Sequence, residues 1–152
     1  SNVIRNSLLM GKQKLIPFNE EMKLVNDYLG LEKTRFEDKL TIIKNIDSTT
    51  DNFLVPPLMI QTLVENGIKH GTSKLPKGGT LEINSTIIND KLMIVIYNCG
   101  VYHKNEKSET GFGIVNTVQR LKLLFGNKAS FEIKNENGKV KTILIIPKET
   151  IL

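Results

Sequence analysis

Four side chains of different chemistry lie within two turns of a helical pattern near the middle of the chain. They fall in the stretch VPPLMIQTLVENGIKHG, residues 55 to 71, and they are Glu65, Asn66, Lys69 and His70. On a helix over 58 to 70 they lie within about 140° of the circumference, and the pairs 65/69 and 66/70 are one turn apart. An amide oxygen can complete a Mg²⁺ shell, and a lysine is a point charge suited to phosphate. The stripe fits a metal and phosphate site, and it fits equally well a partly exposed helix end with a histidine near its C-terminus.

The apolar residues of the same stretch are expected on the other side of the helix. We expect Leu58, Leu63 and Val64 to face a sheet, because they lie away from the polar stripe. The helix then has a core side and a polar side.

Two glycine-bearing segments could serve the same ligand. One is Asn98-Cys99-Gly100, at the end of a β-rich run, and the other is Gly111-Phe112-Gly113, just before a helical pattern. Glycine lets main-chain N–H groups come close to a phosphate, and a helix N-terminus favours anions. A lone G-x-G mostly marks a loop. Three separate segments that can each serve a nucleotide are more specific than any one of them.

Helical patterns occur on both sides of the polar stripe. Asn19 is a good N-cap, and the apolar spacing after it predicts a helix over about 19 to 37. A shorter helix is expected over 2 to 10. Pro56-Pro57 opens the central helix, and a further helix runs from about 114 to Gly126.

Strand patterns fill most of the remaining chain. LTIIKNI, residues 40 to 46, is β-rich, and residues 80 to 88 and 91 to 98 flank Asn89-Asp90 at the spacing of a two-residue hairpin. A second hairpin is expected around Glu136-Asn137-Gly138, and a polar loop over Gly100 to Gly113. Helices interspersed with antiparallel hairpins predict an α+β sandwich, with a sheet on one side and helices on the other.

Composition limits the function classes only broadly. The chain has 152 residues and a formal charge of +5, which is ordinary for one globular domain. Its single cysteine excludes an intrachain disulfide, and no run approaches the roughly 20 apolar residues of a membrane span. Aromatic residues do not alternate with Lys or Arg on any expected strand, which argues against a nucleic-acid-binding module. The start at Ser1-Asn2, without Met, indicates a fragment of a longer protein.

Three segments in order resemble one protein family. VPPLMIQTLVENGIKHG is similar to the asparagine box of sensor histidine kinases usually paired with LytTR-type response regulators, close to P-P-x-x-x-Q-x-L-V-E-N-A-x-x-H-G. FNEEMKLVNDYLGLEKTRFEDKL is similar to E-x-x-x-x-x-x-Y-L-x-x-E-x-x-R-F, and GFGIVNTVQRLKLLFG to G-x-G-L-x-N-x-x-x-R-L-x-x-x-Y-G. The resemblance covers nearly the whole chain. It implies the Bergerat ATP-binding fold, a two-layer α/β sandwich whose mixed, mostly antiparallel sheet is covered by helices on one face.

The resemblance also implies roles for the polar stripe. Asn66 would bind Mg²⁺ and the phosphates of ATP, with Lys69 and His70 near the phosphate chain. Glu65 matches the acidic residue before that asparagine and is the candidate catalytic carboxylate, although many histidine kinases place their acid one turn earlier, where this chain has Thr62.

The glycine-bearing segments receive roles by the same resemblance. Asn98 would read the adenine amino group, with Gly100 beside it. Gly111 and Gly113 would shape a lid over ATP, with 101 to 110 as its flexible part. Asn116 and Arg120 also match family positions. Asn116 would help to bind the nucleotide, and for Arg120 a purely structural role as an anchor is the alternative.

Two departures from the family pattern bear on activity. Asn98 and Tyr102 stand where the pattern has aspartate and glycine, and a neutral amide accepts a hydrogen bond without charge assistance, so adenine binding is expected to be weakened but kept. The family's phosphoacceptor histidine lies in an N-P-H-F-L-F-N-like helix that does not occur here. His70 is assigned to the ATP site, and His103 lies in the lid.

The resemblance implies the ATP-binding catalytic domain of a two-component histidine kinase. Residues 19–152 would form that domain, and residues 1–18 the tail of the upstream dimerisation and phosphoacceptor segment. The expected partners are ATP, Mg²⁺, that upstream segment and a response regulator, in a homodimeric protein anchored in the bacterial inner membrane. The fragment itself would be cytoplasmic and contact neither membrane nor nucleic acid. The alternative is a nucleotide-binding regulatory module that no longer transfers phosphate.

Overall fold

The computed structural model describes residues 15–71, 76–103 and 109–151, and the side chains of 109–112 lie outside that description. The short helix expected over 2 to 10 therefore falls outside the described residues. The longer helices are α2 (Phe18–Phe36), α3 (Met59–His70) and α4 (Glu109–Phe125). The main strands are β2 (Leu40–Ile46), β4 (Gly79–Ile88), β5 (Lys91–Cys99), β6 (Ser130–Glu136) and β7 (Lys139–Ile146). Short 3₁₀ turns are η1 (Glu37–Lys39), η2 (Ser48–Thr50) and η4 (Gly126–Lys128).

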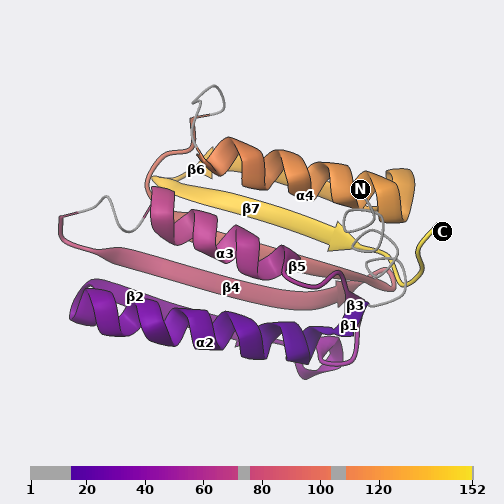
Figure 1. Ribbon diagram of the computed structural model, residues 1–152, viewed down its shortest axis with the longest axis horizontal. Coiled ribbons are helices and arrows are strands. Elements are labelled where there is room, and N and C mark those ends of the chain that lie inside the picture. The colour runs from indigo at the N-terminus through magenta and orange to yellow at the C-terminus, as the bar shows by residue number, and fades with distance from the viewer. Residues whose placement is uncertain (1–14, 72–75, 104–108, 152) are drawn as a thin grey trace, which may run out of the picture.

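The strands form one mixed sheet in the order β2-β4-β5-β7-β6 (Figure 1). β2 is parallel to β4, and the other three neighbouring pairs are antiparallel. A separate antiparallel pair joins β1 (Ile16–Pro17) to β3 (Leu54–Val55). The mixed, mostly antiparallel sheet expected from the sequence is confirmed.

Both predicted hairpins are confirmed, and their turns explain why the sequence could predict them. Asn89 and Asp90 have φ of 51° and 64°, and Asn137 and Gly138 have φ of 52° and 77°. Positive φ at both central residues is the backbone of the two-residue turn that matches strand twist, and Asn, Asp and Gly adopt it at low cost.

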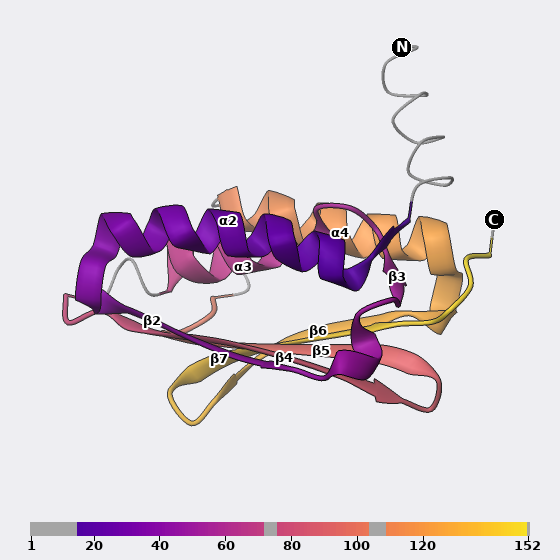
Figure 2. The same cartoon turned by 90° about the horizontal axis from the view of Figure 1, so that it is seen from below.

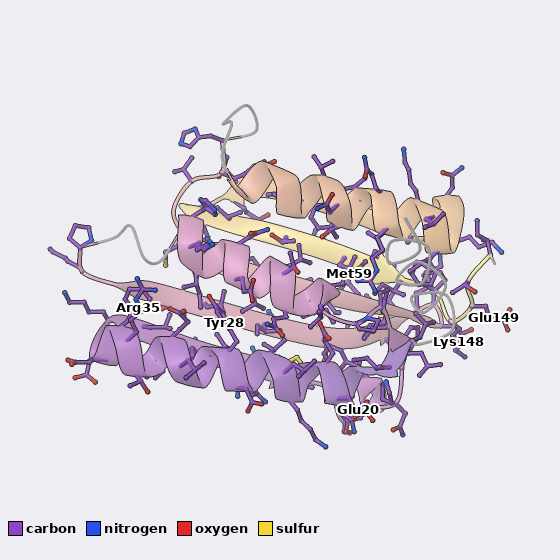
Figure 3. All side chains as sticks on the ribbon, viewed as in Figure 1. Glu20, Tyr28, Arg35, Met59, Lys148 and Glu149 are labelled. Carbon is purple, nitrogen blue, oxygen red and sulfur yellow. The ribbon has the colours of Figure 1, made fainter. Side chains whose placement is uncertain are left out.

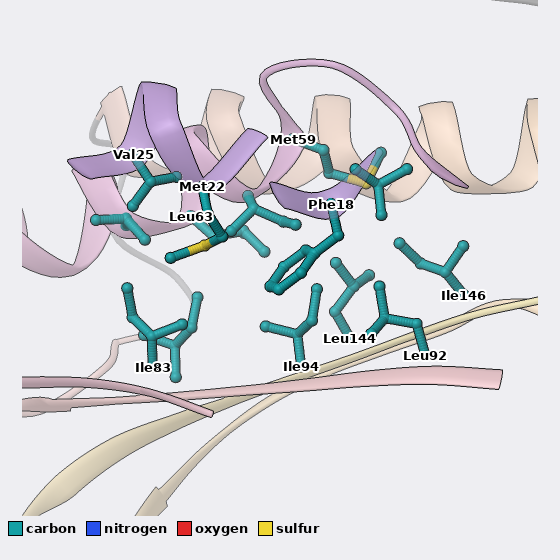
Figure 4. Packing of buried hydrophobic residues seen from close by; sticks show 14 of the residues in the cluster. Phe18, Met22, Val25, Met59, Leu63, Ile83, Leu92, Ile94, Leu144 and Ile146 are labelled. Atoms are coloured by element: carbon teal, nitrogen blue, oxygen red, sulfur yellow. The ribbon is translucent and has the colours of Figure 1, made fainter. Parts of the chain in front are cut away.

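The helices cover one face of the sheet, as Figure 2 shows edge-on. α3 lies between α2 and α4, and the apolar faces of the three helices pack on the inner face of the sheet (Figures 1 and 4). The buried cluster includes Phe18, Val25, Ile60, Leu63, Ile83, Ile94 and Leu144. No helix in the described part of the chain is long and apolar enough to cross a membrane.

The prediction that Leu58 faces the sheet is wrong. Leu58 precedes the first residue of α3, has φ of 66° and is 53% exposed. This left-handed backbone turns the chain into the helix and points the side chain outward. Leu63 and Val64, a little over one turn into α3, are buried as predicted.

The loop expected over Gly100 to Gly113 is shorter than predicted. α4 begins at Glu109, so Gly111 and Gly113 lie in its first turns and not in a loop. Residues 101–103 have no regular structure, and 104–108 lie outside the described residues. Glycine is a poor helix former, so the sequence argued for a loop where the structure continues the helix.

Candidate functional site

The last turn of α3 lies directly on the end of β5, and glycines make this contact possible. A Cβ atom added at Gly71 would be 2.2 Å from Asn98 Nδ2 and 2.6 Å from the Cys99 carbonyl oxygen. Atoms cannot approach that closely, so only glycine fits at this position. Gly100, with φ of 122°, lies on the other side of the contact, where its own Cβ would be 3.4 Å from Gly71 Cα.

Asn98 is consequently held beneath α3. It is 5% exposed, and its Nδ2 donates to the Cys99 carbonyl at 3.2 Å. Its Oδ1 lies 3.2 Å from the place that a Cβ of Gly67 would occupy. The amide predicted to read adenine thus lies against Gly67, the residue that follows Asn66 in the chain.

Asn66 faces the start of α4. A Cβ at Gly113 would be 2.8 Å from Asn66 Nδ2 and 3.4 Å from Thr62 Cγ2. The Nδ2 atom is buried, and within the described part of the chain no group accepts a hydrogen bond from it. A buried polar group without a partner is costly, and a polar ligand would satisfy it. The same amide, turned about its last side-chain bond, would present Oδ1 to a cation.

Glu65 lies on the other side of α3, toward α2. Its Oε1 accepts a hydrogen bond from Gln61 Nε2 at 3.0 Å. Burial raises the pKa of Tyr28 on α2 (labelled in Figure 3) far above its ordinary value, and the carboxylates of Glu32 and Glu65 raise it further. The two neighbours Glu65 and Asn66 therefore face different helices.

The other predicted site residues lie around these contacts. Lys69 is exposed and His70 half-buried in the last turn of α3, and Asn116 is exposed on α4. Thr117, one residue on, donates from its hydroxyl to the Gly113 carbonyl at 2.8 Å. Among the described residues, no group of three or more His, Cys, Asp or Glu side chains could hold a metal ion. A cation here would therefore need ligand oxygens in addition to Asn66.

Sequence reasoning missed the role of Glu21. Its carboxylate is fully buried and accepts three backbone N–H groups at the start of α3, although Glu21 itself lies in the first turn of α2. Arg120 reaches the same place from α4. The only sequence signal was that both residues match family positions.

Sequence reasoning also missed a contact at the start of the segment that was predicted to form the lid. The Asn135 side chain on β6 accepts from the Tyr102 N–H at 2.8 Å and donates to the Tyr102 carbonyl at 3.1 Å. This pair of bonds fixes the backbone where the family pattern has a glycine. Nothing in the spacing of the sequence pointed to Asn135.

Solved structures define the class of fold. The catalytic domain of histidine kinase ThkA has a TM-score of 0.66 and 15% identity, over 89% of this chain and 95% of that one. Full-length ShkA in complex with AMPPNP has a TM-score of 0.64 and 12% identity, over 90% of this chain and 31% of that one. ThkA in complex with the response regulator TrrA has a TM-score of 0.62 and 18% identity, over 97% of this chain and 46% of that one. The chain thus has the fold of histidine kinase catalytic domains.

Sequence comparisons point to the same class of proteins. The family described as histidine kinase matches residues 1–40. Sensor protein LytS of Staphylococcus haemolyticus is 31% identical over 99% of this chain, and LytS of Bacillus subtilis is 32% identical over 89%. The chain spans only 28% and 25% of these two proteins. The chain is similar in sequence to LytS-type sensor proteins and corresponds to about a quarter of their length.

Proposed function

We propose that this chain is the Mg-ATP-binding catalytic domain of a two-component sensor histidine kinase. The observation that carries the proposal is the meeting of three segments at one end of α3. Asn66, Asn98 and Gly113 come from α3, β5 and α4 and lie around the same turn. Structural likeness to ShkA, solved with the nucleotide AMPPNP, supports a nucleotide as the ligand.

Each part of the site can be given a role toward ATP. The Asn98 amide oxygen would accept from the adenine amino group, and Asn66 would hold the phosphates and Mg²⁺. Lys69, His70 and Asn116 would line the phosphate chain, and Gly100, Gly111 and Gly113 would let main chain come close to it. Mg²⁺, when bound, supplies positive charge that offsets the charge on the phosphates.

Phosphoryl transfer needs mainly positioning and charge stabilisation, and these side chains can supply both. Glu65 is the candidate catalytic carboxylate. It would have to leave its hydrogen bond with Gln61 to reach a phosphate on the other side of α3.

The remaining parts of the whole protein are also proposals. Residues 19–152 would form the catalytic domain, and 1–18 the tail of the upstream segment that carries the phosphoacceptor histidine and dimerises. The partner would be a response regulator, supported by the ThkA structure with TrrA, and its type would be LytTR. The domain would work in the cytoplasm, in a protein anchored in the bacterial inner membrane.

A regulatory module that binds nucleotide without transferring phosphate is the second candidate. It is favoured by the neutral Asn98 at the adenine position and by Asn135, which holds Tyr102 where the family pattern has a glycine. Both features could reduce turnover while the pocket is kept.

Titration with ADP and ATP, with Mg²⁺ or with EDTA, tests nucleotide binding. A ligand that binds only the native state adds about 2.7 kcal/mol at a hundredfold excess over Kd, so the melting temperature should rise. Asn66→Ala should remove the Mg²⁺-dependent part of this rise, whereas Asn127→Ala, in exposed η4 at the far end of α4, should not. An unchanged melting temperature of the parent at millimolar nucleotide would rule out the proposal.

A further inference from the structure

Charged side chains from the two flanking helices hold the start of α3. The N–H groups of Leu58, Ile60 and Gln61 donate to the Glu21 carboxylate at 2.8, 3.1 and 3.1 Å. A helix leaves its first N–H groups without intrahelical partners, and the N-cap residue Leu58 has no side chain that could serve them. Glu21, on the first turn of α2, therefore caps a helix other than its own.

Arg120 completes this junction from α4. Its Nη1 donates to the Pro57 carbonyl at 2.6 Å, immediately before the residues that Glu21 binds. Burial lowers the pKa of the Arg120 guanidinium, and the negative charge of Glu21 partly offsets this effect, so the two side chains interact electrostatically. Residues 57 to 61 are thus fixed from both sides.

Leu58 shows that this junction imposes a conformation on the chain. Its φ of 66° is costly for a residue with a side chain. Such a conformation persists only where the surrounding contacts over-determine it. The bonds to Glu21 and Arg120 flank this residue on both sides, and they set the angle at which the chain enters α3.

The position of α3 matters most at its other end. A helix rises about 1.5 Å per residue, so Asn66 lies roughly two turns beyond the capped N–H groups and moves with them. At that end the contacts leave little freedom, since Gly71 and Gly67 already lie against Asn98. A small rotation or shift of α3 would change how Asn66 faces Asn98 and Gly113.

We propose that Glu21 and Arg120 are positioning residues of the nucleotide site, which fix α3 from its N-terminus and so place Asn66. This inference rests on the proposed function. Neither residue would touch the nucleotide. Both would be needed for its Mg²⁺-dependent binding.

The test compares Glu21→Gln and Arg120→Lys with Glu20→Gln, an exposed neighbour on the same turn of α2. Gln keeps the shape of Glu21 but turns one acceptor into a donor that faces N–H groups. Below the melting temperature of every variant, we expect Kd for Mg-ADP to rise roughly tenfold in the first two variants, with a smaller effect in EDTA. Glu20→Gln should match the parent. A lower melting temperature with unchanged Kd would mean that Glu21 and Arg120 stabilise the fold but do not position the nucleotide site, and it would overturn the inference.

A second measurement needs no nucleotide. In the ligand-free protein, the NMR signals of the Asn66 and Asn98 side-chain amides should move in Glu21→Gln and stay in place in Glu20→Gln. Unmoved signals would overturn the inference. If Glu21→Gln does not fold, Glu21→Asp and Arg120→Lys carry the same two measurements. Failure of the parent protein to bind nucleotide would contradict the proposed function. The amide signals of the ligand-free protein would still show whether Glu21 positions α3.

Discussion

Asn98 replaces a charged acceptor with a neutral one, and its surroundings give a reason for the amide. Its Nδ2 donates to the Cys99 carbonyl, and the side chain is buried against two glycines of α3. A carboxylate could not make that donation and would be expensive to bury before adenine binds. The amide therefore favours the ligand-free fold, although in its proposed role it would bind adenine more weakly than a carboxylate would.

Asn98→Asp should consequently separate stability from affinity. We expect a lower melting temperature without ligand, and tighter binding of adenine nucleotides, because a charged acceptor makes a hydrogen bond roughly twice as strong. Calorimetry with ADP and with IDP measures this, since IDP lacks the amino group and should show no gain. Equal or weaker ADP binding would mean that Asn98 does not accept from adenine.

Gly113 offers a matched pair of substitutions. In Gly113→Ala the new Cβ would lie 2.8 Å from Asn66 Nδ2, so the amide must move, while Gly30→Ala in α2 meets nothing within 4 Å. Both changes should favour the helix by about 1 kcal/mol. We expect Gly30→Ala to raise the melting temperature with unchanged nucleotide binding, and Gly113→Ala to weaken Mg²⁺-dependent binding without unfolding the protein. Equal nucleotide affinity in both variants would mean that Gly113 does not belong to the nucleotide site.

The contact between α3 and β5 leaves no room for a side chain at position 71. Gly71→Ala would push a methyl group into Asn98 Nδ2 and into the backbone carbonyl oxygens of Gly67 and Cys99. The side chain can move aside, but the two backbone carbonyls cannot. Overpacking of this kind costs about 1–3 kcal/mol. Urea unfolding should show a loss in that range together with weaker nucleotide binding, because α3 and β5 are forced apart. A stable variant with parent-like affinity would contradict the close contact.

The elements themselves were largely predictable, because their signals are local. The Asn89-Asp90 and Asn137-Gly138 turns and the apolar spacing of the helices specify their own backbone. The polar stripe of α3 was also predicted from spacing. Periodicity does not say which neighbour a face meets, so it could not show that Glu65 faces α2 and Asn66 faces α4. Leu58, Glu21 and Asn135 were missed because tertiary contacts decide their roles.

The positions of the two histidines of the chain bear on its activity. His70 is half-buried at the end of α3, and His103 is exposed in the segment that was predicted to form the lid. Neither lies in a segment like the family's acceptor helix. The domain should therefore bind ATP without becoming labelled on histidine.

Incubation with γ-labelled ATP tests this expectation. Supplying the upstream helical segment, in cis or as a separate dimeric piece, should restore transfer, and Asn66→Ala should abolish it. Acid-labile phosphate on the chain alone would contradict the assignment of His70 to the nucleotide site. Intact binding with no transfer to the full-length dimer would favour the regulatory module.

The parallel pairing of β2 with β4 has a consequence for the order of folding. The β4–β5 and β6–β7 hairpins close through two-residue turns, so little chain entropy is lost when they form. β2 meets β4 only after the long stretch that includes η2, β3 and α3 has been crossed, and such non-local pairing is slow. We therefore expect the hairpins to form before the non-local β2–β4 and β5–β7 pairings, which complete the sheet beneath the helix that carries Asn66. We expect the site around Asn66 to be complete only after these non-local strand pairings have formed.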